Sequence, residues 1–260
     1  MIIDSKLKSF RTIIRKNSKR IVDYIVQSKI SRNSNTDISN KQEICVFCST
    51  TKDLTKEHII PRWIYENSPN KFFTTNINGL NQTYNKTTIP TCSVCNNERL
   101  NILEVYVNKL FSEINIESIS LNNNQIENII RWLEVIDYKF EILNSRRRFL
   151  KSSENEYIGY LSDFPLTILR ENLKYNPNKV ISEIRRSLKR LTIKDKSKNR
   201  NSLIFLKTSN SNFHFFHTMD EFIFIELPKY KLGVFYFYKR IFETNEMAQI
   251  ESKKIIEKCY

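Results

Sequence analysis

Hydrophobic residues recur at intervals of three and four along much of this chain, a spacing typical of amphipathic helices. Near the start, Leu7, Phe10, Ile14 and Ile21 fall on one helical face, and basic residues occupy most of the other positions. The pattern predicts five helices. They are expected at residues 4–30, in the segment after Cys95, at 124–144, at 179–192 and at about 243–258.

From residue 202 the pattern changes to aromatic and β-branched residues that alternate with polar ones, which predicts strands joined by short turns. We expect an antiparallel meander. His214 and His217 lie three positions apart in the second run, so their side chains should point to opposite faces. Neither has a carboxylate or cysteine neighbour at ligand spacing, and we interpret both as structural. The four runs cover residues 202–208, 212–217, 221–227 and 231–240.

The rest of the chain gives weaker patterns. Residues 31–43 are polar without periodicity and predict a linker. Residues 57–61 predict a short strand that ends at Pro61, and residues 62–90 are expected to form a long irregular loop or a substrate-contacting insertion. The sequence therefore predicts an α+β protein in three parts. These are a basic helix with its linker over 1–43, a central domain over 44–110 and an α+β accessory domain over 111–260.

Charge suggests a polyanionic partner. The 260 residues include 42 Lys and Arg against 28 Asp and Glu, a net charge of +14. Most of the excess lies in 1–43 and 111–200, on either side of the central domain. Such an excess suits nucleic acid, although abundant Lys, Asn and Ile also indicate an AT-rich coding sequence. The basic face of helix 4–30 has the same two interpretations, phosphate binding or plain solvation, and we favour solvation.

Nothing in the sequence predicts a membrane segment or a secretory signal. No apolar run approaches the roughly 18 residues that cross a bilayer. The first 16 residues lack an apolar stretch followed by small residues. Four of the five cysteines form Cys-x-x-Cys pairs, which favours metal binding in a reducing compartment over disulfides. We therefore expect a cytoplasmic protein with no membrane partner.

The central domain carries the chemistry. Cys45 and Cys48 form one two-thiolate pair, and Cys92 and Cys95 form another, the ligand set of a tetrahedral zinc ion. Four protein ligands leave no open position, so this zinc is expected to be structural. Of the three histidines, only His58 lies between the two pairs.

Glu57, His58 and Asn96 form a second candidate site in the same domain. A carboxylate and an amide oxygen suit Mg²⁺ or a similar cation, and a neutral imidazole can remove a proton from water. This combination predicts phosphodiester hydrolysis. The alternative is a zinc ribbon that only binds nucleic acid or protein, with Glu57 and His58 as surface residues and Asn96 as a helix cap.

The three motifs together, Cys45-x-x-Cys48, Glu57-His58-Ile-Ile-Pro and Cys92-x-x-Cys95-Asn96, resemble the bacterial HNH endonucleases that carry a four-cysteine zinc site. The resemblance covers about residues 44–110. It implies a ββα-metal core in which a β-hairpin and a helix surround one divalent cation, Mg²⁺ or Mn²⁺. His58 would be the general base, Glu57 and Asn96 would hold the cation, and DNA would be the favoured substrate over RNA.

The resemblance also assigns supporting residues. A Glu is expected on the helix after the second cysteine pair, here Glu104. The family's middle Asn has no counterpart just before Cys92, and Asn85, or with less support Asn81, could serve. Three basic residues near the motifs are candidate nucleic-acid contacts: Lys56, Arg62 and Arg99.

The accessory domain shows no motif that identifies its role. It could select a target, sense a signal, form a homodimer or bind a protein partner. Bacterial enzymes of the resembling kind serve restriction, phage defence or mobile elements, and a defence or restriction role is one expectation for this chain.

Overall fold

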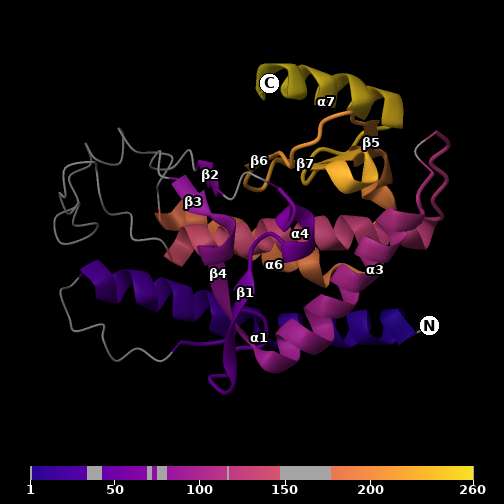
Figure 1. Ribbon diagram of the computed structural model, residues 1–260. Helices are drawn as coiled ribbons and strands as arrows, with labels where there is room; N and C mark the ends of the chain where they lie inside the picture. The colour runs from indigo at the N-terminus through magenta and orange to yellow at the C-terminus, as the bar shows by residue number, and fades with distance from the viewer. Residues whose placement is uncertain are drawn as a thin grey trace.

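The computed structural model describes residues 2–33, 43–68, 72–74, 81–115, 117–146 and 177–259. It is a mixed α+β structure, as predicted, with helices packed around a central helix and antiparallel strands in three small sheets (Figure 1). None of the described helices is long and apolar enough to span a membrane. The longer helices are α1 (Ile2–Asn33), α3 (Asn101–Glu113), α4 (Asn123–Arg146), α6 (Pro177–Thr192) and α7 (Asn245–Cys259).

The central region is built on a β-hairpin between distant segments. Strand β1 (Leu54–His58) pairs antiparallel with β4 (Thr88–Cys92), and Leu54 lies opposite Cys92. A π-helical turn, η2 (Val94–Leu100), follows β4 and continues into α3. The predicted apolar stripe of this helix is confirmed, since the side chains on it are buried: Leu100, Leu103, Val107 and Leu110.

Two expectations for this region were wrong. The strand covers residues 54–58 and not 57–61, because its backbone pairs with β4 as far as His58 and the chain then turns. Residues 62–90 are also not simply irregular. They include the first residues of β4, which local sequence pattern does not predict because its partner strand lies at least thirty positions away. They also include four short elements: α2 (Arg62–Tyr65), β2 (Phe72–Thr74), β3 (Asn81–Thr83) and η1 (Tyr84–Lys86).

The C-terminal strands form a four-stranded antiparallel sheet in the order β5-β8-β7-β6. The meander expectation holds for the last three strands but not for β5, which pairs with β8 at the far edge. One face of the sheet packs on α4, and the other is covered by α7, which lies above it in Figure 1. The strands are β5 (Leu203–Lys207), β6 (Phe215–Thr218), β7 (Phe222–Leu227) and β8 (Leu232–Phe237).

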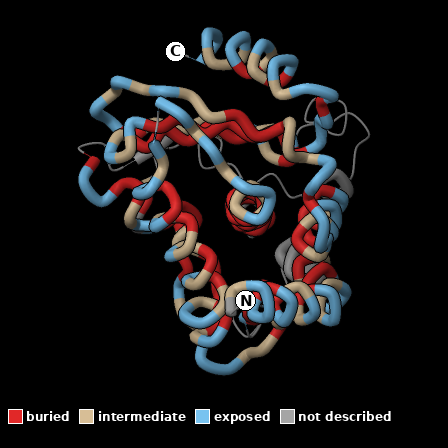
Figure 2. Tube along the Cα trace, turned by 90° about the vertical axis from the view of Figure 1, so that its right-hand side faces the viewer, coloured by how far each residue is buried: buried red, intermediate tan, exposed pale blue. Residues whose placement is uncertain are grey.

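Helix α4 is the centre of the molecule. Figure 2 shows it end-on and buried, with other elements around it. Its apolar residues belong to one cluster that also contains side chains from α1, β4, α3, α6 and the sheet. The three predicted parts of the chain therefore share a core. Unusually for such a helix, five charged residues on it are also buried, namely Arg131, Glu134, Asp137, Lys139 and Glu141.

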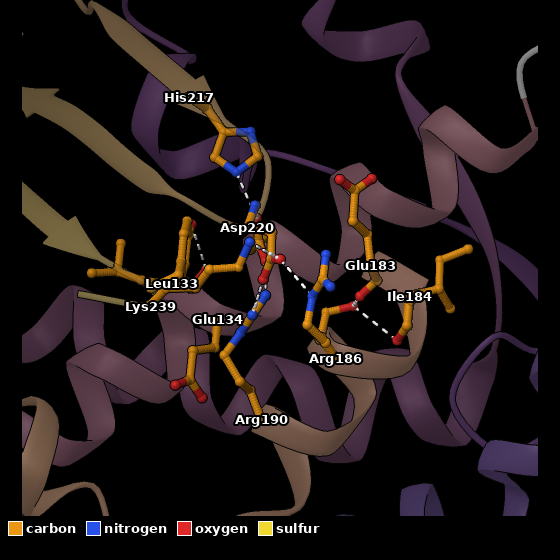
Figure 3. A network of polar contacts seen from close by, with 12 residues as sticks. Leu133, Glu134, Glu183, Ile184, Arg186, Arg190, His217, Asp220 and Lys239 are labelled. Atoms are coloured by element: carbon orange, nitrogen blue, oxygen red, sulfur yellow. Dashed lines mark hydrogen bonds and ion pairs between the residues drawn. The ribbon is translucent and has the colours of Figure 1, made fainter. Parts of the chain in front are cut away.

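A network of charges joins α4 and α6 to the sheet (Figure 3). Arg190 on α6 contacts both Asp137 and Asp220, whose side chains are fully buried. His217 Nε2 lies 2.8 Å from Asp137 Oδ1, and the Asp220 backbone N–H donates to the same oxygen at 3.0 Å. Arg186 Nε donates to Asp220 Oδ2 at 2.8 Å, and Lys239 pairs with the same carboxylate.

The structural interpretation of His217 agrees with this network. Neither strand histidine has a carboxylate at ligand spacing in the sequence, but each has one in the fold. Asp137 lies 80 positions from His217 in sequence. His214 Nδ1 lies 3.1 Å from Glu226 Oε2 on the neighbouring strand. Sequence spacing could not show either pair, because both depend on how the sheet docks.

This network predicts acid sensitivity. Burial by itself raises the pKa of Asp137, but His217 and Arg190 lower it overall. A lowered folded-state pKa stabilises the protein above the unfolded value of about 4, and the contribution is lost as pH falls below it. We expect Asp137→Asn to cost about 1.5–3 kcal/mol at pH 7 and less at pH 3. Urea titrations at both pH values test this, with exposed Glu257→Gln as the control; an equal cost at both would contradict it.

Candidate metal centre and active site

The hairpin brings the two cysteine pairs together. Cys45 and Cys48 lie in a tight turn in which the Ser49 N–H donates to the Cys45 carbonyl at 2.8 Å. The Val46 N–H donates to Pro90 O of β4 at 3.2 Å, which fixes this turn beside the second pair. Cys92 ends β4 and Cys95 lies in the first turn of η2. Pairing of β1 with β4 therefore closes the long segment between the two pairs.

The four sulfur atoms fit a zinc ion. All four Sγ atoms lie within 4.8 Å of one another, and Cys48 and Cys92 are 3.6 Å apart. A tetrahedral zinc with bonds of about 2.3 Å needs sulfur separations of about 3.8 Å. Cys45, Cys92 and Cys95 are buried, and Cys48 is partly buried. The site is closed, as a structural zinc site requires.

Arg99 lies beside the four-cysteine cluster. Its Nη1 donates to Cys95 Sγ at 2.9 Å. Burial lowers the pKa of Arg99, but the sulfur of Cys95 raises it overall, so the guanidinium stays charged beside the cluster. Four thiolates around Zn²⁺ carry a net charge of −2, and one adjacent cation offsets part of it. Arg99, which the sequence predicts as a nucleic-acid contact, therefore has a second role, to balance the charge of the sulfur cluster.

Glu57 points inward, toward α4. Its carboxylate pairs with the ammonium group of Lys139, which is fully buried. Lys139 Nζ also donates to Glu104 Oε1 at 3.2 Å and to the backbone carbonyl of His58 at 3.1 Å. The three N–H donors of the ammonium therefore each have an acceptor. Burial lowers the pKa of Lys139, but Glu57 and Glu104 raise it overall, so the residue is charged.

His58 lies on the opposite side of β1 from Glu57, as the alternation of a regular strand requires. It is partly exposed, and its Nε2 accepts a hydrogen bond from Arg62 Nε at 3.4 Å. Lys56 precedes it by two positions, so it lies on the same side of the strand, and it is exposed. Two of the predicted nucleic-acid contacts, Lys56 and Arg62, therefore flank the predicted base.

Asn96 makes its side-chain hydrogen bond to β1 and does not cap a helix. It lies within η2, and its Nδ2 donates to Thr55 Oγ1 at 3.0 Å. Thr55 Oγ1 in turn donates to the Thr91 carbonyl at 2.7 Å, so the amide is held against the hairpin. The side chains of Asn85 and Asn81 lie outside the described part of the structure.

The arrangement separates two sets of predicted residues. Over the residues that the structure describes, the four cysteines form the only group of three or more His, Cys, Asp or Glu placed to hold a metal ion. Glu57 pairs with Lys139, and the Asn96 amide nitrogen donates to Thr55. The predicted divalent cation on these two residues stays a prediction. Sequence reasoning missed Lys139, which lies between two buried aromatic residues, Tyr138 and Phe140, and carries no motif.

Comparisons with protein-family models, with curated proteins and with solved structures found no match to this chain. The assignment of function therefore depends on the residues and on their geometry.

Proposed function

We propose that this protein hydrolyses phosphodiester bonds in nucleic acid, as an HNH-type nuclease, with His58 as the general base. The observation that carries the proposal is the position of His58. It is partly exposed at the end of β1, between the cations Lys56 and Arg62. The hairpin of β1 and β4 followed by η2 and α3 has the order of elements that the resemblance implies.

The hydrolytic step needs one base and positive charge at the phosphate. Water attacks the phosphorus atom while His58 Nε2 takes its proton, and the bond from phosphorus to the 3′ oxygen breaks. The leaving oxygen takes a proton from solvent, which gives 5′-phosphate and 3′-hydroxyl ends. Arg62 now donates to Nε2, and a phosphate group would compete for this guanidinium because it offers two acceptors at once. Arg62 and Lys56 would then stabilise the charge that develops on the phosphate.

Lys139 is a positioning residue in this proposal. It holds the carbonyl of His58 and the carboxylate of Glu57, and so anchors the end of β1 to α4. The sequence predicts a Mg²⁺ or Mn²⁺ ion on Glu57 and Asn96, but these side chains are engaged elsewhere. The hydrolytic step described above uses no such ion, and the assay below measures whether added Mg²⁺ or Mn²⁺ changes the rate.

One observation favours a second candidate, a zinc module that binds nucleic acid or protein without catalysis. The pairing of Glu57 with a buried ammonium removes the carboxylate that the resemblance assigns to the cation. In that case only the fold around the cysteines would matter, and changes at His58 would leave function intact.

Replacement of His58 distinguishes the two candidates. We expect His58→Ala to slow nicking of plasmid DNA by at least about 100-fold, the usual effect of losing a general base. Each assay is run with Mg²⁺, with Mn²⁺ and without added divalent cation, and a parallel series uses RNA. His214→Ala, a change at another partly exposed histidine, is the matched control and should cut normally. Equal nicking rates for wild type and His58→Ala would refute the assignment, and wild type that binds DNA without nicking it would support the non-catalytic module.

A further inference from the structure

Helices α1 and α6 lie side by side and form a groove of about 470 Å³. Arg15 Nη2 on α1 donates to the carbonyl of Thr192 at the end of α6 at 3.1 Å. Further along, Val22 and Asp23 of α1 share the groove with Arg185 of α6. The two helices are therefore antiparallel here, and segments about 170 positions apart build one surface.

Four exposed cations line this groove, two from each helix: Arg15, Lys19, Arg185 and Lys189. Asp23 is the single acidic residue in the lining, which gives a local net charge of +3 (4 minus 1). Val22 and Leu188 are buried and form an apolar floor, and Ser18 and Thr192 add hydroxyl groups.

These four cations differ from their neighbours on the same helix. Arg186 and Arg190, on the other side of α6, pair with Asp220, and Arg190 also pairs with Asp137. By contrast, the structure records no ion pair for any of the four groove cations with the residues that it describes. Like charges gathered in a concavity repel one another, so an anion bound between them would be stabilised.

We propose that this groove binds the sugar–phosphate backbone of a nucleic acid. On each helix the two cations are four positions apart, a spacing of about 6 Å along the axis. Two such rows present repeated positive charge along an open groove, which suits a polymer of phosphates better than one small anion. The apolar floor can accept sugar or base edges between phosphates. The cationic face of α1, which by itself fits solvation, becomes half of a binding surface because α6 supplies the other half.

The role of this groove in cleavage rests on the proposed function, but its binding to nucleic acid can be measured without hydrolysis. Fluorescence polarisation with a labelled 20-nucleotide single strand and a 20-base-pair duplex tests it in His58→Ala, so that the probe stays intact. Lys19→Gln with Lys189→Gln should weaken binding at least about tenfold at 100 mM salt. The slope of log K against log salt should fall by about 1.4 for the single strand and about 1.8 for the duplex, since each phosphate contact contributes about 0.7–0.9.

A matched control removes the same charge elsewhere. Lys253→Gln with Lys258→Gln changes two exposed lysines on α7, at the opposite side of the molecule from α1 (Figure 1), and should leave affinity and salt slope unchanged. Equal loss in both double variants would overturn the proposal, because net charge alone would then explain binding. Competition by tripolyphosphate as strong per phosphate as by DNA, or binding only to anionic vesicles, would also overturn it. Groove-dependent binding with no cleavage by wild type would refute the nuclease and keep the groove.

Discussion

Cys92→Ser is expected to release zinc and to unfold the region around the β1–β4 hairpin. The residue supplies one of four sulfur ligands that lie within 4.8 Å of one another, and it is also the last residue of β4. Structural zinc sites bind with about 10–16 kcal/mol of apparent free energy, much of which stabilises the fold. Loss of one ligand should remove enough of this to lower the melting temperature by about 10 °C or more.

Two measurements check this expectation. Metal analysis of purified wild type should find one zinc per chain, and the variant should hold little. Thermal unfolding followed by circular dichroism should then show the loss of stability. Cys259→Ser is the matched control, since Cys259 is exposed at the end of α7 and outside the cluster, and neither quantity should change. Folded wild type without zinc, or a variant as stable as wild type, would be incompatible with a structural metal centre.

Lys139→Met should be the most damaging change outside the cysteines, with a loss of about 3–5 kcal/mol of stability at pH 7. Methionine fills similar space but leaves Glu57 and Glu104 buried without the ammonium that lies between them. It also removes the hydrogen bond to the His58 carbonyl, so the end of β1 loses its anchor on α4. Chemical denaturation measures the first effect, and nicking of plasmid DNA by folded variant measures the second.

The loss should depend on pH in a defined direction. Burial raises the pKa of Glu104 even beside Lys139, and removal of the ammonium will raise it further. A raised folded-state pKa means that the folded protein binds more protons than the unfolded chain between the two pKa values. Stability of the variant should therefore fall as pH rises above about 4.3, and the deficit should be greater at pH 7 than at pH 5.

Companion variants make the Lys139 result interpretable. Adding Glu57→Gln and Glu104→Gln to Lys139→Met removes the unpaired negative charge and should restore part of the stability at pH 7. Lys86→Met alters an exposed lysine on η1 and should leave the stability unchanged. A deficit that does not change with pH, or that the added glutamines deepen, would show that packing and not charge explains the role of Lys139.

The sequence by itself determined the elements that depend on local pattern. Periodicity predicted the helices, because each helix packs one face on the core and therefore has apolar residues at every turn on that face. Alternation predicted the C-terminal strands for the same reason. The two Cys-x-x-Cys pairs predicted the four-sulfur cluster, since each pair positions two ligands within a single turn.

The tertiary structure alone decided everything that depends on which elements meet. β1 pairs with β4, and β5 pairs with β8. The sequence of each strand does not predict which other strand it pairs with. Docking of α4 gave Glu57 a buried ammonium as its neighbour, and docking of α6 on α1 turned two ordinary cationic faces into one groove. The physical reason is that a charge acts over a few ångströms in space, and the chain's order fixes such distances only within a helix or a turn.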